Sequence, residues 1–113
     1  MKKESIIEQK SFAYAIKIIN LYNILCEKHE FVMSNQLLRC GTSIGANVAE
    51  GERGQTKADF LSKMNIALKE ANETKYWLRL LFATGYIDEK FDDLLLEIEE
   101  IIAILVAITK NKN

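Results

Sequence analysis

The sequence predicts an all-α protein in which four amphipathic helices pack as one antiparallel up-down-up-down bundle. The 113 residues include no proline and only five glycines, so little interrupts a helix and few residues favour β-turns. Apolar residues recur at steps of three and four through four segments, which is the periodicity of an α-helix. The segments are joined by short connections, which place consecutive helices side by side and antiparallel.

The first helix is expected over residues 5–28. Ser5 and Glu8 form a Ser-x-x-Glu capping box at its start. Five apolar side chains then follow at helical spacing: Phe12, Ile16, Ile19, Tyr22 and Cys26. The single histidine, His29, falls in the short connection that follows, where a solvated loop residue is expected.

The second helix is expected over residues 34–50, with Ser34 as its N-cap. Its core stripe has steps of four, three and four: Leu37, Gly41, Ile44 and Val48. Glycine inside a helix costs about 1 kcal/mol relative to alanine, so Gly41 and Gly45 indicate a close backbone approach to a neighbouring helix. Gly51 is predicted to cap the end of the helix, since no strand or Lys-Ser/Thr pair marks a phosphate loop here.

The third helix is expected over residues 56–84, beginning at Thr56 and ending at Gly85. Its seam alternates steps of four and three: Phe60, Met64, Ala67, Ala71, Thr74, Leu78 and Leu81. The fourth helix is expected over residues 88–110, with an equally regular seam: Phe91, Leu94, Ile98, Ile101, Leu105 and Ile108.

The end of the fourth helix is apolar on every side from residue 101 to residue 108. A helix of that kind is buried on more than one side, which favours a contact between subunits. The run is far shorter than the roughly 20 residues of a membrane span, and no signal peptide is apparent. We therefore expect a cytoplasmic homo-oligomer without membrane contact.

Composition excludes several kinds of site. With 49% hydrophobic residues, 27% charged residues and a net charge of −1, the chain resembles an ordinary globular protein without a basic bias. The only histidine lies outside any Glu-x-x-His motif, which argues against a di-iron bundle and against a histidine-assisted nucleophile. Cys26 and Cys40 are too few and too far apart for a metal site or disulfide framework. We predict core cysteines, no catalytic, cofactor-binding or metal-binding residues, and no enzyme activity.

Two polar stripes are the most specific feature. One stripe lies on the second helix and the other on the third: Arg39, Ser43, Asn47 and Glu50; and Glu70, Glu73 and Trp77. The stripes are expected to meet, with Arg39 binding a carboxylate of the third helix. The structural interpretation is a polar layer that fixes helix register. The functional interpretation is a small pocket, with Arg39 as anion contact and Trp77 as its apolar wall.

Basic side chains near the second loop are the candidate nucleic-acid contacts: Arg53, Lys57 and Lys63. Along the third helix, lysines recur every six residues, which scatters them around the helix and weakens a nucleic-acid face on a monomer. A ring of subunits would instead gather copies of Arg53 and Lys57 into one surface.

Long blocks of the chain resemble a bacterial family. They are EFVMSNQLLRCGTSIGANVAEG (30–51), KADF (57–60), IALKEANET (66–74) and YWL (76–78). The chain resembles four-helix-bundle, ribosomal-protein-like proteins encoded in intervening sequences of bacterial 23S ribosomal RNA genes. The resemblance implies a barrel-like homopentamer without known enzyme activity, and the family pattern includes Arg39, Ser43, Asn47, Glu50, Glu70 and Glu73. A relative, the accessory protein of diversity-generating retroelements, works with a reverse transcriptase and nucleic acid through a strongly basic surface, which a net charge of −1 does not match.

The sequence and the family resemblance suggest two alternative functions. The first is a non-enzymatic homo-oligomeric bundle acting as an RNA-associated or assembly factor, with RNA or a nucleic-acid-processing protein as partner. The alternative is a protein-interaction or small-ligand scaffold that binds no nucleic acid.

Overall fold

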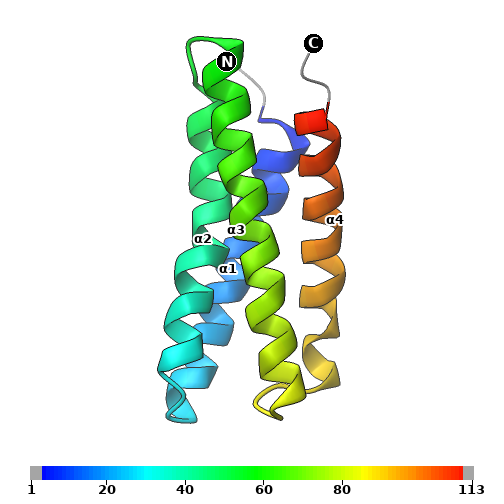
Figure 1. Cartoon of the computed structure of the whole chain (residues 1–113). Coiled ribbons are helices and arrows are strands. Elements are labelled where there is room, and N and C mark those ends of the chain that lie inside the picture. Colours follow the sequence, from blue (N-terminus) through cyan, green and yellow to red (C-terminus); the bar gives the residue numbers. More distant parts are fainter. Residues whose placement is uncertain (1–3, 111–113) are drawn as a thin grey trace.

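Four α-helices run along one long axis in the computed structural model, which describes residues 4–110 (Figure 1). They are α1 (Ile6–Glu27), α2 (Val32–Glu52), α3 (Lys57–Ala83) and α4 (Asp92–Lys110), and a short 3-10 turn, η1 (Glu89–Phe91), precedes α4. Consecutive helices are antiparallel neighbours, and α4 closes the bundle against α1. The predicted all-α, up-down bundle is confirmed. None of the helices in the described range is long and apolar enough to cross a membrane.

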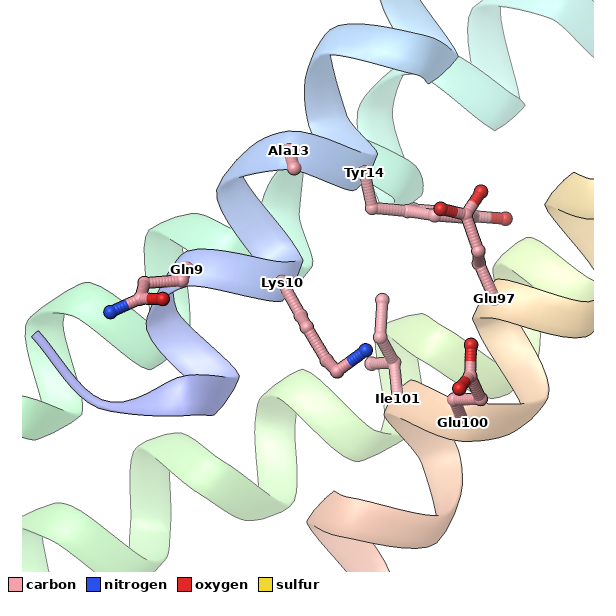
Figure 2. A pocket seen from close by; sticks show the side chains of 7 residues that line it. All are labelled: Gln9, Lys10, Ala13, Tyr14, Glu97, Glu100 and Ile101. Carbon is pink, nitrogen blue, oxygen red and sulfur yellow. The ribbon is translucent and has the colours of Figure 1, made fainter.

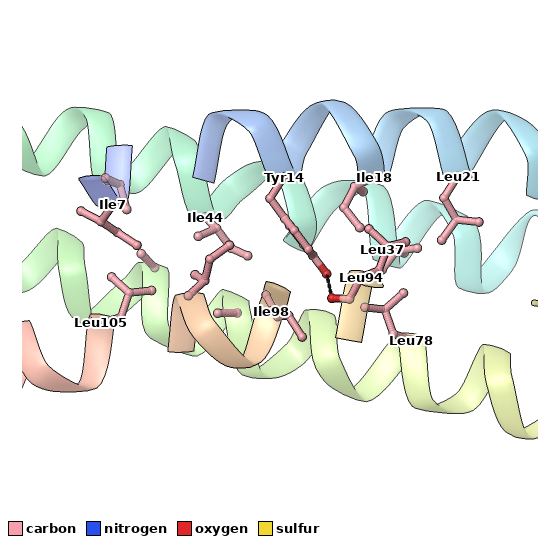
Figure 3. Close-up of a cluster of buried hydrophobic side chains, with 14 of the residues drawn as sticks. Ile7, Tyr14, Ile18, Leu21, Leu37, Ile44, Leu78, Leu94, Ile98 and Leu105 are labelled. Atoms are coloured by element: carbon pink, nitrogen blue, oxygen red, sulfur yellow. Dashed lines mark hydrogen bonds between the residues drawn. The ribbon is translucent and has the colours of Figure 1, made fainter. Parts of the chain in front are cut away.

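The core follows the predicted seams of α2, α3 and α4 (Figure 3). Leu37, Ile44 and Val48 of α2 are fully buried, as are the α3 seam residues from Met64 to Leu81. In α4 the buried seam runs from Leu94 to Leu105. Cys40 is buried as expected, whereas Cys26 is only partly buried.

The core side of α1 is not the stripe that begins at Phe12. Its buried apolar side chains are Ile7, Tyr14, Ile18, Leu21 and Leu25. Phe12, Ile16 and Ile19 are instead 66%, 49% and 43% exposed. This helix therefore has two apolar faces, and only one of them can point into a four-helix core.

The glycines of α2 decide which face of α1 is buried. A Cβ atom on Gly41 would lie 2.8 Å from Cγ2 of Ile18, and one on Gly45 would lie 3.3 Å from the backbone oxygen of Ser11. The predicted close approach of α2 to a neighbour is thus confirmed, and the neighbour is α1. Because Ser11 and Ile18 fill the space that the glycines leave, the Phe12 side of α1 turns outward.

Two predicted ends of α2 are wrong. The helix begins at Val32, because the Glu30 carboxylate accepts hydrogen bonds from the backbone N–H groups of Met33 (3.1 Å) and Ser34 (2.7 Å) and so takes the capping role. Ser34 lies inside the helix and is buried. Gly51 does not cap the end, since α2 continues to Glu52. Its missing side chain instead admits α3, whose Lys63 Cβ would lie 3.0 Å from a Cβ at Gly51.

Most other helix ends match the sequence. Ser5 and Thr56 cap α1 and α3 by accepting from the N–H groups three residues on, at 3.2 and 3.0 Å. Gly85 ends α3 with a φ of +80°, the left-handed conformation that glycine adopts without strain. Asp88 caps η1 rather than α4, so the last α-helix begins four residues later than predicted. His29 is an exposed loop residue, as expected.

Candidate functional site

The two predicted polar stripes meet on the outer face of α2 and α3. Arg39 on α2 donates from Nη1 to Oε2 of Glu70 at 3.1 Å, and its Nη2 contacts the carboxylate of Glu73. Trp77 donates from its indole Nε1 to Oε2 of the same Glu73 carboxylate at 3.3 Å. One guanidinium thus joins two carboxylates one turn apart on α3, a charge-assisted arrangement that fixes how far the helices slide.

This Arg39 cluster lies at the protein surface. The Arg39 side chain is half exposed, whereas that of Glu70 is only 13% exposed. Partial desolvation lowers the pKa of Arg39, but the neighbouring Glu73 and Glu70 carboxylates raise it more, so the net shift is upward. Behind the cluster, burial raises the pKa of the Cys40 thiol, which favours the neutral form expected of a core residue.

The rest of the α2 stripe is also satisfied within the chain. Asn47 donates from Nδ2 to the Ser43 carbonyl oxygen at 2.9 Å and to the Ser43 hydroxyl at 3.2 Å. Glu50 forms an ion pair with Nζ of Lys63 on α3 at 2.6 Å. Arg39 and Glu50 therefore both bind α3 of the same chain, an arrangement that favours the structural interpretation, a layer that sets helix register.

The candidate nucleic-acid contacts lie near the α2–α3 loop, but two of them already have acidic partners. Arg53 pairs through Nη1 with Glu8 of α1 at 2.9 Å and also donates to the carbonyl of Ala49 at 2.8 Å. Arg53 and Lys63 line one surface hollow of 280 Å³, which acidic side chains line as well. Lys57 is exposed at the start of α3. The structure thus brings Arg53 and Lys63 together in a mixed-charge site rather than a basic one.

The seam between α1 and α4 carries polar groups that the sequence did not single out. Tyr14 donates from its hydroxyl to the carbonyl of Leu94 at 2.9 Å. Burial, and secondly the charge of Glu97, raise the pKa of the Tyr14 phenol. Glu97 pairs through Oε1 with Nζ of Lys17 at 2.6 Å, while its buried Oε2 has no hydrogen-bond partner in the described part of the chain. No local sequence motif predicts these contacts, because the partners on α1 and α4 are 80 residues apart in the chain.

No group of three or more His, Cys, Asp or Glu side chains within residues 4–110 is arranged to hold a metal ion.

Comparison with known proteins identifies the family. The family model for the 23S rRNA-intervening sequence protein matches residues 3–107. The chain belongs to this family. A family relative is known from a crystal structure at 1.70 Å resolution: a protein with unknown function from the S23 ribosomal protein family of Bacteroides thetaiotaomicron VPI-5482. It is 50% identical to this chain, with a TM-score of 0.90, over 94% of this chain and 100% of that one. None of the curated proteins compared with the chain matches it.

Proposed function

We propose that this chain is a non-enzymatic bundle that assembles with copies of itself, as a homopentamer, and serves as an RNA-associated or assembly factor. The observation that carries the proposal is the row of exposed apolar side chains on α1, Phe12, Ile16 and Ile19, which we call the α1 stripe. Their spacing of four and three residues places them on one helix face.

The α1 stripe has the character of a contact surface. Single exposed apolar side chains are common, whereas a contiguous exposed apolar row marks a site of association. Burying a side chain of this size releases about 1.5–3 kcal/mol. The end of α4 supports the same conclusion, because Val106 of its apolar run is 43% exposed in a single copy. The α1 stripe and Val106 are thus apolar surfaces that the other helices of the same chain leave exposed.

Light scattering on a size-exclusion peak tests self-assembly. The wild-type chain is expected at a multiple of 12.9 kDa, and the stripe variant, Phe12→Glu with Ile19→Glu, at the mass of one chain. Val32→Glu is the matched control, because Val32 is 75% exposed at the start of α2, outside the stripe. A wild-type chain that elutes as a monomer contradicts the proposal.

The family description supports RNA as partner, since it connects these proteins with 23S rRNA intervening sequences. Filter binding to an intervening-sequence RNA tests this part. Retention is expected to fall steeply with salt, because phosphate contacts release counterions, and Lys57→Ala is expected to reduce the salt slope. No retention at low salt would remove RNA as partner.

The alternative is an interaction scaffold that binds no nucleic acid. The pairing of Arg53 with Glu8 and of Lys63 with Glu50 favours it, because both cations are already neutralised within the chain. An assembled oligomer that retains no RNA would support this alternative and leave self-assembly intact.

A further inference from the structure

We propose that the outward face of α3 binds single-stranded RNA, with Tyr76 stacking on a base and with Lys69 and Arg79 binding phosphates on either side of it. This inference rests on the RNA association proposed above and names the surface that makes the contact. The face consists of exposed residues at alternating steps of three and four, which we call the outer α3 row: Ser62, Asn65, Lys69, Asn72, Tyr76 and Arg79.

The outer α3 row carries positive charge and no carboxylate. The opposite face of the helix, from Met64 to Leu81, forms the buried seam, so the row faces solvent. Asn65 and Asn72 donate from Nδ2 to carbonyl oxygens of their own helix, at 2.9 and 3.1 Å, and add no charge. In a chain with 16 acidic residues, about five helical turns without a carboxylate on one face form a surface that attracts anions.

The two cations of the row form no ion pair with any residue of 4–110, and this separates them from other basic side chains of α3. Lysines recur every six residues along this helix. Lys63 pairs with Glu50 at 2.6 Å and Lys75 pairs with Glu99 at 2.5 Å, whereas Lys69 lies between them on the solvent side. The structure thus selects which basic residues of α3 stay available to a partner.

The acidic side chains beside the row are directed away from it. Glu70 and Glu73 both bind Arg39 on α2. Their charges are therefore partly offset by a cation that lies outside the row. Lys69 and Arg79 are left to attract an anion from solution.

Tyr76 is an exposed aromatic residue whose ring is positioned by its neighbour. The residue is 55% exposed, and its ring meets that of Trp77 with 5.4 Å between centroids and an angle of 74° between planes. Trp77 in turn donates from Nε1 to the Glu73 carboxylate at 3.3 Å. Because an edge-to-face pair leaves at least one face of each ring uncovered by the other, Tyr76 can offer a face to a base.

The spacing along α3 suits a single strand that crosses the row. Arg79 is three residues from Tyr76, so the two side chains are neighbours on the helix surface. Lys69 lies seven residues away on the other side, about 10 Å along the helix axis. A base on the Tyr76 ring would therefore have a cation on each side of it for the adjacent phosphates.

The exposed ring between two cations favours single-stranded RNA over other anionic partners. Proteins bind unpaired bases by stacking them on aromatic side chains, and they neutralise the phosphates with lysine and arginine. An acidic peptide would use the cations but has no base to stack on the ring. In a duplex the bases are stacked on one another and do not reach it.

The hollow between α1 and α4 lacks this combination, although it also has an exposed lysine (Figure 2). Lys10 extends over this hollow of 270 Å³, but Glu97 and Glu100 line it as well. Its aromatic residue, Tyr14, is buried and donates its hydroxyl to the carbonyl of Leu94. The carboxylates would repel a phosphate, and no exposed ring is present for a base.

Fluorescence anisotropy with a labelled single-stranded oligouridylate of about 12 nucleotides tests the inference. Tyr76→Ala is expected to weaken binding at least about fivefold without changing the salt dependence, because it removes base stacking alone. Tyr76→Phe keeps the ring and should bind like the wild type. Lys69→Ala with Arg79→Ala should reduce the slope of log affinity against log salt by about 1.4, as expected for two lost phosphate contacts.

Lys75→Ala is the matched control, because it removes a cation beside Tyr76 that pairs with Glu99 outside the row. It should bind like the wild type. A strand of the same length without bases should bind the wild type as weakly as the oligouridylate binds Tyr76→Ala. Circular dichroism and light scattering establish that every variant keeps the helix content and mass of the wild type.

The outcomes separate this inference from the proposed function. If the wild type binds the oligouridylate and both Tyr76→Ala and the double variant bind it equally well, the outer α3 row is not the contact, while RNA association stands. If only the double variant is weaker and the strand without bases binds as tightly as the oligouridylate, the row is a general anion surface, as for an acidic peptide, and the inference is wrong. A wild type that does not bind at low salt removes RNA as partner and this inference with it.

Discussion

Two outer faces of this bundle differ in whether their side chains have partners within the same chain. On the α2–α3 face, Arg39 binds Glu70 and Glu73, and Glu50 binds Lys63. On α1, the stripe from Phe12 to Ile19 is apolar and largely exposed. The charged side chains of the first face are paired within the chain, whereas the second face is the one that the proposed self-assembly would cover.

The two faces also differ in the free energy that contacts of each kind contribute. Exposed ion pairs contribute about 0.2–1 kcal/mol each, because solvent screens them. Burial of a large apolar side chain contributes about 1.5–3 kcal/mol. We therefore expect the α2–α3 face to adjust the stability of one chain, and the α1 stripe to decide whether chains associate.

The largest expected effect concerns the α1 stripe. The thermal midpoint of the wild-type chain should rise with protein concentration, because association stabilises the folded state by mass action. The stripe variant, Phe12→Glu with Ile19→Glu, should show no concentration dependence. Scanning calorimetry over a range of concentrations measures both, and a wild-type midpoint that stays constant would contradict the assignment of this face.

Gly41→Ala tests how α2 holds α1 with its stripe outward. The new methyl group would lie 2.8 Å from the buried Ile18 side chain. Overpacking costs about 1–3 kcal/mol, and the gain in helix propensity offsets about 1 kcal/mol, so a net loss of about 1 kcal/mol is expected. Gly45→Ala, whose nearest contact would be 3.3 Å, should lose less. Denaturant titration that finds Gly41→Ala as stable as the wild type would refute this packing.

Tyr14→Phe tests the α1–α4 seam. Loss of the hydrogen bond to Leu94 leaves a buried carbonyl without that donor and should cost about 1 kcal/mol. Because the pKa of Tyr14 is raised in the folded state, its contribution is complete below pH of about 10 and is lost as pH rises further, where the unfolded phenol ionises. The variant should therefore lose stability less steeply than the wild type above that pH. If the unfolding free energies of variant and wild type fall with the same slope above pH of about 10, Tyr14 is not the group that causes the loss of stability.

Arg39→Ala should have the smallest effect, a loss of less than about 1 kcal/mol, since half of the Arg39 side chain is exposed. Its oligomer mass should equal that of the wild type. An unchanged bundle that loses a bound ligand or partner would instead restore the functional interpretation of the Arg39 cluster. Denaturant titration and light scattering on the same sample distinguish these outcomes.

The sequence predicted the core well wherever one stripe of a helix keeps an unbroken alternation of steps of three and four. The α2, α3 and α4 seams were assigned correctly except at three end positions, Phe60, Phe91 and Ile108, which are only partly buried. In α1, Ile18 and Ile19 are adjacent and both apolar, and only the position of Gly41 on another helix selects Ile18 for the core.

Among the polar side-chain contacts, some could be predicted from the sequence and others could not. The meeting of Arg39 with Glu73 was predictable, because each stripe lies on one face of its helix and α2 and α3 are consecutive antiparallel helices joined by a short loop. The pairing of Arg53 with Glu8 was not, since these residues are 45 positions apart and Glu8 has a plausible local role in a capping box. The Glu30 cap was missed for a different reason: it is a local contact, but Ser34 is the more conventional N-cap residue. Contacts between distant segments need the assembled bundle before they can be seen.

Native mass spectrometry of the unmodified chain tests the central claim most directly, because it counts the copies that cover the α1 stripe. We predict a single closed species, with five copies of the 12.9-kDa chain for a homopentamer. A spectrum dominated by one copy would contradict it, because the stripe would then stay exposed in solution.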